Sequence, residues 1–329
     1  MTRPAVGAAL APRPSCGSRH GGELFGRGAS AAPTPARLAL LGTGNVGSAV
    51  LERLQRLGDR FELVHVANTR QASGDFDAAG IVIDATASEA VAERHAEWLA
   101  RGVHVVTACK LGQGGPLRRW RAIRDAAAAG GARYGDSATV GAGLPLLRTI
   151  RALRAGGDRI HGIAGVLSGS LAWLFDAYDG TRPFAACVRQ AQAAGYTEPD
   201  PRDDLSGEDV RRKLLILARA AGFELESDAV RVESLAGASD DALRDRLAAA
   251  RASGGRLAFV ARLQDGVASA RLEVLPPDDP LATGRGTDNR VALWSDRYAA
   301  QPLVIQGPGA GAAITAAALL DDAIAVSTR

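Results

Sequence analysis

Apolar runs that alternate with amphipathic helical periods dominate the chain from residue 36 to about residue 138. The first run, residues 38–41, ends in a glycine-rich loop, and a helical period follows it. The other apolar runs have the length of strands and lie at residues 61–67, 81–83 and 103–107. Strands that alternate with helices predict an α/β domain with a doubly wound, Rossmann-type parallel sheet and helices on both faces.

The pattern changes after about residue 139. Five segments are predicted as strands, at residues 160–167, 257–263, 267–275, 291–294 and 303–305. Asp265-Gly266 lies between two of them and is a strong hairpin signal. We therefore expect a second, α+β domain with an antiparallel sheet over residues 139–305. A last helix, at 313–324, is expected to complete the first domain together with the rest of residues 306–329.

Composition narrows the possible compartments and partners. Residues 1–35 are rich in Gly, Ala, Arg and Pro without apolar periodicity, and we predict a disordered extension there. The net charge of +3 comes without a basic patch, so we expect no nucleic-acid partner. The three cysteines lie far apart, which fits a reducing cytoplasm. No apolar run approaches the ~20 residues of a membrane span, so no membrane association is expected.

The glycine-rich loop reads Gly42-Thr-Gly44-Asn-Val-Gly47 and joins a predicted strand to a predicted helix. In that context the first glycine permits a tight turn and the second lets a pyrophosphate approach the backbone. The third allows the helix to pack closely on the strand. The helix N-terminus then favours the phosphate charge. The alternative is a glycine-rich turn that binds no ligand.

The residues after the second predicted strand bear on the choice of cofactor. They are Asn68-Thr-Arg70, where NAD-specific proteins have an acid that binds the ribose 2′-hydroxyl. No carboxylate is present, and Arg70 can pair with a 2′-phosphate. This favours NADP as the cofactor, with NAD possible. The alternative is that Arg70 faces solvent.

Lysine is rare in this chain. Among 39 lysine and arginine residues, the lysines are Lys110 and Lys213. The two side chains are interchangeable where they only carry charge in water. In catalysis they are not, because an ammonium can give up a proton whereas a guanidinium stays charged. Unless both are products of drift, these lysines are candidates for proton transfer.

One of the lysines follows a cluster of acids. Six Asp and Glu residues lie between positions 198 and 209, interrupted by two prolines that forbid a continuous helix. We therefore place Glu198 and Asp204 on a rigid loop. Carboxylates of this kind suit the ammonium group of an amino-acid substrate. The alternative is a solvated acidic loop.

A helix is predicted to start at Ser206, which puts Asp209 and Lys213 on one face, one turn apart. Reduction of an aldehyde leaves an alkoxide that must be protonated, and a lysine can supply that proton. Two simpler interpretations remain open. Ser206 and Asp209 can form a capping box, and Asp209 with Lys213 can be an exposed ion pair that contributes about 0.3–0.5 kcal/mol.

These segments together resemble homoserine dehydrogenase, in particular the catalytic portion fused behind aspartate kinase in bifunctional enzymes. The matching motifs occur in family order from residue 37 to the end, and the segment at 195–218 is the most specific. They lie at 42–47, 84–88, 104–110, 139–145, 165–170, 195–207, 212–218 and 307–311.

The resemblance implies roles for individual residues. Lys213 would donate and accept the proton, and Lys110 would border both cofactor and substrate. Glu198 and Asp209 would bind the amino-acid substrate, with Asp204 in support. The candidate catalytic residues are therefore Lys213, Lys110 and Asp209. The candidate cofactor-binding residues, including the Arg70 discussed above, are Gly42, Thr43, Gly44, Asn45, Val46, Gly47, Arg70, Thr86, Lys110, Gly195 and Gly311.

Two positions depart from the family pattern. Cys109 stands where the family usually has Asn, and Ser137 stands where it usually has Glu or Asp. In some members that acid and nearby carbonyls hold a sodium ion, and the matching carbonyls here belong to Val140, Ala142 and Leu144. We expect no firm metal site. Either Asp136 rotates in to compensate or the loop keeps its shape without an ion.

The resemblance thus implies an NAD(P)H-dependent reduction of L-aspartate 4-semialdehyde to L-homoserine, a reversible step toward threonine and methionine. The resemblance also implies a homodimer that forms through the second sheet. Two alternatives are another small amino-acid dehydrogenase of the same architecture and a nucleotide-binding paralogue without turnover. Retention of both lysines and of the loop acids argues against the paralogue.

Overall fold

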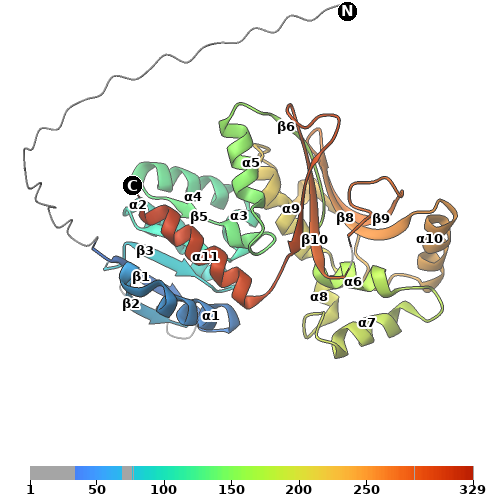
Figure 1. Cartoon of the computed structure of the whole chain (residues 1–329), viewed down its shortest axis with the longest axis horizontal. Coiled ribbons are helices and arrows are strands. Elements are labelled where there is room, and N and C mark those ends of the chain that lie inside the picture. Colours follow the sequence, from blue (N-terminus) through green and yellow to red (C-terminus); the bar gives the residue numbers. More distant parts are fainter. Residues whose placement is uncertain (1–33, 69–75, 77, 285, 329) are drawn as a thin grey trace, which may run out of the picture. The chain divides into compact units, whose positions relative to one another are not determined.

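The computed structural model describes residues 34–68, 76, 78–284 and 286–328. The extension predicted for residues 1–35 lies almost entirely outside this described part. The chain from Pro35 onward contains two β-sheets (Figure 1).

Within the described residues, the first sheet is parallel and has five strands in the order β2-β1-β3-β4-β5. They are β1 (Ala36–Leu41), β2 (Phe61–Ala67), β3 (Ile81–Asp84), β4 (His104–Thr107) and β5 (Tyr134–Gly135). The predictions for the first four are confirmed to within two residues. The fifth was missed because two residues carry no readable apolar pattern.

The period-two alternation along β1 divides the core between the two faces of this sheet. Leu38 and Leu40 lie in one buried cluster, and Ala39 and Leu41 lie in another. Each fully buried large aliphatic side chain contributes roughly 1.5–3 kcal/mol. The covering helices are α1 (Asn45–Leu54) and α11 (Ala312–Ser327) on the first face, and α2 (Glu89–Ala100) and α4 (Leu117–Gly130) on the second. The predicted doubly wound fold is confirmed.

The strand order reverses between β1 and β3, which lie side by side. β1 continues into Gly42, and β3 continues into Ala85. In an open α/β sheet, ligands bind outside the carboxyl ends of the strands at such a reversal. The topology therefore assigns the dinucleotide crevice to these two loops.

The second sheet has six strands in the described residues, in the order β11-β10-β6-β8-β9-β7. They are β6 (Ile160–Val166), β7 (Val230–Val232), β8 (Arg256–Gln264), β9 (Val267–Leu275), β10 (Asp288–Ser295) and β11 (Leu303–Pro308). The sheet is mixed rather than purely antiparallel, because β7 pairs parallel to β9. The predicted hairpin is confirmed: Gln264 pairs with Val267, and both turn residues, Asp265 and Gly266, have positive φ.

One face of the second sheet is covered by helices. A large buried cluster joins inward-facing residues such as Ile163 and Leu293 to Leu214 and Leu217 of helix α9. The α-helices between β5 and α11 are α5 (Leu146–Ala155), α6 (Gly169–Ala177), α7 (Phe184–Ala193), α8 (Pro201–Leu205), α9 (Glu208–Ala220) and α10 (Asp240–Ala252).

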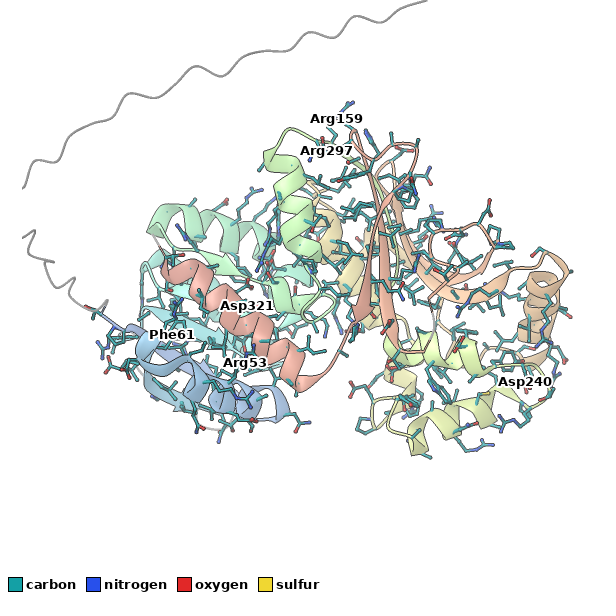
Figure 2. The ribbon with its side chains drawn as sticks, viewed as in Figure 1. Arg53, Phe61, Arg159, Asp240, Arg297 and Asp321 are labelled. Carbon is teal, nitrogen blue, oxygen red and sulfur yellow. The ribbon has the colours of Figure 1, made fainter. Side chains whose placement is uncertain are left out.

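Ion pairs tie the end of this sheet where β6 begins and β10 ends. Arg159 lies 3.3 Å from Asp296, and Arg297 lies 3.4 Å from Asp158. Figure 2 shows both arginines at this end of the sheet. Because the arginines are more than half exposed, such pairs contribute little to stability. Among the described residues, no helix has the length and apolar character needed to cross a membrane.

Candidate active site

Both lysines of the chain meet at a single carboxylate. Lys213 Nζ lies 2.7 Å from Oδ2 of Asp209, and Lys110 Nζ lies 3.3 Å from Oδ1 of the same side chain. Asp209 and Lys213 lie one turn apart in α9, as the sequence predicts. Lys110 comes from the segment that follows β4 of the first sheet and is the first residue of the short helix α3 (Lys110–Gly114).

The charge arrangement fixes the ionisation state of Asp209. Burial acts to raise its pKa, but the Lys213 and Lys110 ammonium groups together hold that pKa well below its usual range. Lys213 is the more enclosed of the two lysines, with 12% of its side chain exposed against 35% for Lys110. The carboxylate therefore stays ionised near neutral pH and orients both ammonium groups.

Lys213 has a second anchor. Its Nζ donates a hydrogen bond of 2.8 Å to the backbone carbonyl of Leu167, just beyond the end of β6. An ammonium has three N–H donors. Asp209 and Leu167 use two of them and leave one for a substrate oxygen. No sequence pattern indicates this carbonyl, because any residue type supplies one.

The segment with Asp204 is a helix and not the rigid loop expected from its prolines. Asp204 lies in α8, whose first residue is Pro201. The prediction was wrong because the first turn of a helix needs no N–H from that position. Asp204 accepts hydrogen bonds from the Ser170 hydroxyl and from the Glu198 backbone N–H, both at 2.8 Å. It thus ties the chain around Glu198 to α6.

The side chain of Glu198 remains apart from the lysines. Glu198 is exposed, and no hydrogen bond or ion pair in the described residues joins its carboxylate to Lys110 or Lys213. Its neighbour Tyr196 stacks on Trp173, with ring centroids 5.0 Å apart and planes inclined by 26°. This stack holds the loop against α6 and leaves the Glu198 carboxylate facing solvent.

The capping box proposed for the start of α9 does not form. The N-cap is Gly207 in the left-handed region, with φ of 74° and no side-chain cap. The Ser206 hydroxyl accepts a bond of 3.2 Å from the Glu208 N–H instead. Asp209 is therefore available for the lysines, and the capping interpretation of its role is wrong.

A pocket opens at the reversal point of the first sheet. Its lining residues come from the loops after β1, β2 and β3 and are Gly42, Thr43, Gly44, Asn68, Ala85, Thr86 and Ala87. Gly42 has a φ of 96°, and a Cβ at Gly47 would lie 1.8 Å from the Gly42 carbonyl oxygen. At Gly44 an added Cβ would meet nothing within 4 Å. These positions fit a dinucleotide, because the turn requires two of the glycines and the third leaves the backbone open to a pyrophosphate.

The other predicted cofactor residues differ in their position relative to this pocket. Asn45 begins α1, and Val46 packs in the cluster beneath it. Gly195 follows α7 and Gly311 precedes α11; both have positive φ, and neither lines this pocket. Arg70 lies outside the described residues.

A buried polar network supports Thr86. Asp84, fully buried, accepts bonds from the Thr86 N–H at 2.9 Å and from its hydroxyl at 2.7 Å. The other oxygen of Asp84 lies 3.1 Å from the Thr107 hydroxyl and 3.0 Å from Nε2 of His95. Thr107 in turn accepts a bond from the Cys109 N–H. One carboxylate thus fixes both the pocket residue Thr86 and the loop that carries Lys110.

The turn at Ser137 is occupied by protein groups. The Ser137 N–H and hydroxyl both donate to Asp322 of α11 at 2.8 Å. Asp136 is buried and makes two hydrogen bonds with Arg151, at 2.6 and 2.7 Å. The possibility that Asp136 rotates in to replace the usual acid is therefore wrong, because this guanidinium already binds both of its oxygens.

The carbonyl loop beyond that turn is itself unusual. Val140 is buried, and Ala142 has a φ of 50°, which is uncommon for a residue other than glycine. In the described part of the chain, no group of three or more His, Cys, Asp or Glu residues is arranged to hold a metal ion. Cys109 is buried, and burial raises the pKa of its thiol to about 12, so it is not a nucleophile.

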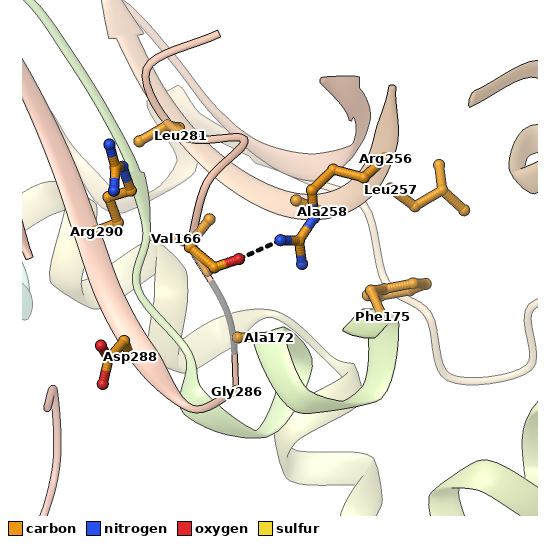
Figure 3. A pocket seen from close by; sticks show the side chains of 11 residues that line it. Val166, Ala172, Phe175, Arg256, Leu257, Ala258, Leu281, Gly286, Asp288 and Arg290 are labelled. Atoms are coloured by element: carbon orange, nitrogen blue, oxygen red, sulfur yellow. Dashed lines mark hydrogen bonds between the residues drawn. The ribbon is translucent and has the colours of Figure 1, made fainter. Parts of the chain in front are cut away.

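A second hollow lies on the face of the second sheet away from α9. Figure 3 shows Arg256 and Arg290 in the lining of this hollow. Arg256 donates to the carbonyls of Ala282 and Gly284, and Arg290 donates to that of Pro280. Both guanidinium groups thus hold the loop that precedes β10 over the sheet. Because these arginines are already satisfied by protein carbonyls, the hollow is a structural feature and not the reaction site.

Comparison with known proteins relates this chain to homoserine dehydrogenases. Residues 145–324 match the model of the homoserine dehydrogenase family, and residues 42–135 match that of the homoserine dehydrogenase NAD-binding domain. Bifunctional aspartokinase/homoserine dehydrogenase 2 of Escherichia coli (strain K12) is 44% identical over 74% of this chain. The chain spans 32% of the length of that relative. A homoserine dehydrogenase of Emericella nidulans is 32% identical, and the match covers 90% of this chain and 99% of the relative.

Solved structures agree. A Candida auris protein of unknown function has a TM-score of 0.83 at 30% identity, with 90% of this chain and 99% of that one covered. A hyperthermophilic archaeal homoserine dehydrogenase in complex with NADPH has a TM-score of 0.73 at 19% identity, covering 89% of this chain and 98% of that one, and supports the fold alone. With two family models and a nearly full-length relative in agreement, this chain belongs to the homoserine dehydrogenase family.

Proposed function

We propose that this chain catalyses the reversible, NAD(P)H-dependent reduction of L-aspartate 4-semialdehyde to L-homoserine. The observation that carries the proposal is the pairing of Lys213 and Lys110 with Asp209. The loop that holds Lys110 is hydrogen-bonded to the loop of the dinucleotide pocket, because the Ala108 N–H donates to the Asp84 carbonyl at 3.0 Å. The acid–base groups and the cofactor pocket therefore share one framework.

The residues of this chain supply the proton and the orientation. When bound, the nicotinamide cofactor supplies the hydride for the aldehyde carbon. Lys213 directs an N–H at the carbonyl oxygen and gives it a proton as the alcohol forms. Asp209 and the Leu167 carbonyl hold that ammonium in place. Lys110 adds a second positive charge beside the same oxygen, which lowers the energy of the developing alkoxide.

The substrate ammonium requires negative charge. We assign its binding to Glu198 and Asp209, with Asp204 positioning the backbone of Glu198. The exposure of Glu198 supports this role, because its carboxylate is not consumed by another side chain in the described residues. Substrate binding would draw this carboxylate toward Asp209 and exclude water.

For the cofactor we propose NADP, with NAD possible. The support is the absence of an acid after β2 and the presence of Arg70 in the sequence. The NADPH bound to the archaeal homoserine dehydrogenase is consistent with this choice. Gly42, Gly44 and Thr86 would hold the pyrophosphate side, and Gly195 and Gly311 would approach the nicotinamide side.

We further propose a cytoplasmic homodimer with one domain for the cofactor (36–138 and 306–329) and one for catalysis and dimerisation (139–305). The face of the second sheet away from α9 is the candidate interface. Its buried residues are all aliphatic, as at Ala164 and Val260, and Trp294 and Val304 on it are only partly buried. Light scattering coupled to size exclusion would test this; a monomer at micromolar concentration would contradict it.

The test of the activity is a steady-state assay of homoserine oxidation and semialdehyde reduction with NADP and NAD. The same assay with alternative amino alcohols tests the rival small amino-acid dehydrogenase. Asp209→Asn provides the internal check, because it removes the charge that holds both lysines. Turnover of homoserine that is no faster than that of the other alcohols would contradict the proposed substrate.

A further inference from the structure

Arg219 is a buried cation that forms no ion pair with a carboxylate in the described residues, although the charge of Glu226 raises its pKa against the larger effect of burial. It lies in the last turn of α9, and only 2% of it is exposed. In the described structure, its hydrogen bonds all go to backbone carbonyls: Gln113 at 2.6 Å, Gly115 at 2.8 Å and Leu225 at 2.8 and 3.2 Å. Burial lowers the pKa of this guanidinium to about 10. Removing a charge from water is costly, so its carbonyl bonds must compensate for that cost.

Two of those carbonyls end the helix that begins with Lys110. Gln113 lies in α3, and Gly115 is its C-cap. The last carbonyls of a helix have no partner within the helix, and a cation there is favourable. Arg219 therefore completes the C-terminal end of α3 from a different domain.

Helix α3 contacts helix α9 near both ends of α9. Lys110 meets Asp209 near the start of α9, and the α3 carbonyls meet Arg219 near its end. Between them, a Cβ at Gly114 would lie 3.0 Å from the Arg212 carbonyl oxygen. The backbones thus approach closely at Gly114, and α3 has little freedom to shift without breaking one of the end contacts.

We propose that Arg219 is a positioning residue that fixes α3 along α9 and so holds Lys110 against Asp209. Its kinetic consequence rests on the proposed dehydrogenase function. Loss of the guanidinium frees the end of α3 and lets Lys110 withdraw from the carboxylate. Lys213 should stay in place, because its partners lie on α9 and just beyond the end of β6, and not on α3.

The chain offers a matched control. Arg154 of α5 donates at 2.9 Å to the carbonyl of Ala220, which ends the same helix α9. Arg154→Met therefore removes a guanidinium–carbonyl bond from the same end of α9 without touching α3. Gly114→Ala tests the same packing without changing Arg219. The new methyl group would push α3 away from α9.

The scarcity of lysine permits a direct measurement. Reductive methylation with ¹³C-formaldehyde gives dimethyl-lysine NMR signals for Lys110 and Lys213, apart from the N-terminal amine. Lys110→Arg assigns them. We expect Arg219→Met and Gly114→Ala to move the Lys110 signal toward that of free dimethyl-lysine and to leave the Lys213 signal in place. Arg154→Met should move neither. If Arg219→Met does not fold, the same NMR comparison is made with Gly114→Ala and Arg219→Lys. A Lys110 signal that keeps its wild-type position in the folded variants overturns the proposal.

A double-mutant cycle tests the kinetic consequence. Arg219→Met should lower kcat on the order of 10-fold in the wild-type background, because a displaced catalytic group loses rate steeply with distance. In the Lys110→Met background the same change should cost less than about 2-fold, since the residue it positions is gone. Equal losses in both backgrounds would show that Arg219 acts on the fold in general. A wild-type chain without turnover would contradict the proposed function alone, because the NMR measurement needs no activity.

Discussion

Lys213 Nζ and Oδ2 of Asp209 lie 2.7 Å apart, one helical turn from each other in α9. Lys110 faces the other oxygen of the same carboxylate, so Asp209 is held between two positive charges. Those charges keep the pKa of Asp209 below its usual range against the opposing effect of burial. Asp209 is therefore a poor proton carrier near neutral pH, and the proton transfer falls to a lysine.

Lys213→Arg should abolish most turnover while it preserves the charge. An arginine at this position can still pair with Asp209, but it does not release a proton near neutral pH. We expect kcat to fall on the order of 10²-fold or more. Cofactor affinity, measured by the fluorescence of bound NADPH, should change little.

Arg211→Lys is the matched control for that variant. Arg211 lies on the same helix and pairs with Glu208, away from the lysines, and its replacement should leave kcat within about 2-fold of wild type. A Lys213→Arg enzyme that keeps more than half of the wild-type kcat would refute the proton-transfer role.

Asp84→Asn should weaken both the fold and cofactor binding. The oxygen of Asp84 that faces His95 and Thr107 accepts from both, and an amide NH₂ there would meet donors. A carboxylate oxygen only accepts, so Nε2 of His95 carries a proton toward Asp84. Nδ1 of the neutral ring then accepts from the Tyr134 hydroxyl, whose pKa burial keeps above its usual range. An unmet buried donor costs ~1–3 kcal/mol.

The measurements for Asp84→Asn are the free energy of unfolding in denaturant and the KM for NADPH. We expect KM to rise several-fold, because an amide that meets donors at its NH₂ end displaces the side chain whose other oxygen anchors Thr86. Glu97→Gln, an exposed change on α2, serves as control. Lower stability with an unchanged KM would mean that the network supports the fold without setting the cofactor pocket.

Arg70→Asp should shift cofactor preference from NADP toward NAD. The 2′-phosphate would meet repulsion, whereas a 2′-hydroxyl would gain an acceptor. The check is kcat/KM for both cofactors, with Arg60→Asp at the opposite end of β2 as a control of equal charge. The same cofactor ratio in Arg70→Asp and in wild type would show that Arg70 does not read the ribose.

Most of the fold could be predicted because most strands and turns are marked by residues close together in the sequence. Strands β1 and β3 contain continuous apolar runs, at residues 38–41 and 81–83, and the β8–β9 turn has Asp265-Gly266. Strand β7 was missed because its three residues gain their order from pairing with β9, far along the chain. Helix α8 was missed because a proline at the first helical position was taken as a breaker.

In the candidate site, contacts within one helix could be predicted from the sequence, whereas contacts between helices could not. Asp209 and Lys213 share one helix, so their spacing predicts their contact. The contact of Lys110 with Asp209 depends on how α3 packs against α9, which no spacing encodes. Arg219 was missed because nothing in the sequence distinguishes it from the many exposed arginines, and only its burial against carbonyls reveals it.

The polar groups of the turn at Ser137 bind other groups of the protein. Asp322 accepts both hydrogen bonds of Ser137, and Arg151 occupies Asp136. Without a carboxylate directed at the carbonyls of Val140, Ala142 and Leu144, a monovalent cation should bind weakly. We expect kcat/KM to respond little when sodium is exchanged for potassium or tetramethylammonium at constant ionic strength. A wild-type enzyme that needs millimolar sodium would contradict this.

Ser137→Glu tests the same turn from the opposite direction. The new carboxylate would face Asp322, whose pKa burial already raises, so the pair of acids should destabilise the turn in tetramethylammonium. Sodium should then restore stability, because a cation between the carboxylates and the loop carbonyls relieves the repulsion. In Ser137→Glu with Asp322→Asn, the repulsion is gone, and the gain in melting temperature on adding sodium should shrink. A gain of equal size in the single and double variants would show that the cation does not act through this pair of acids.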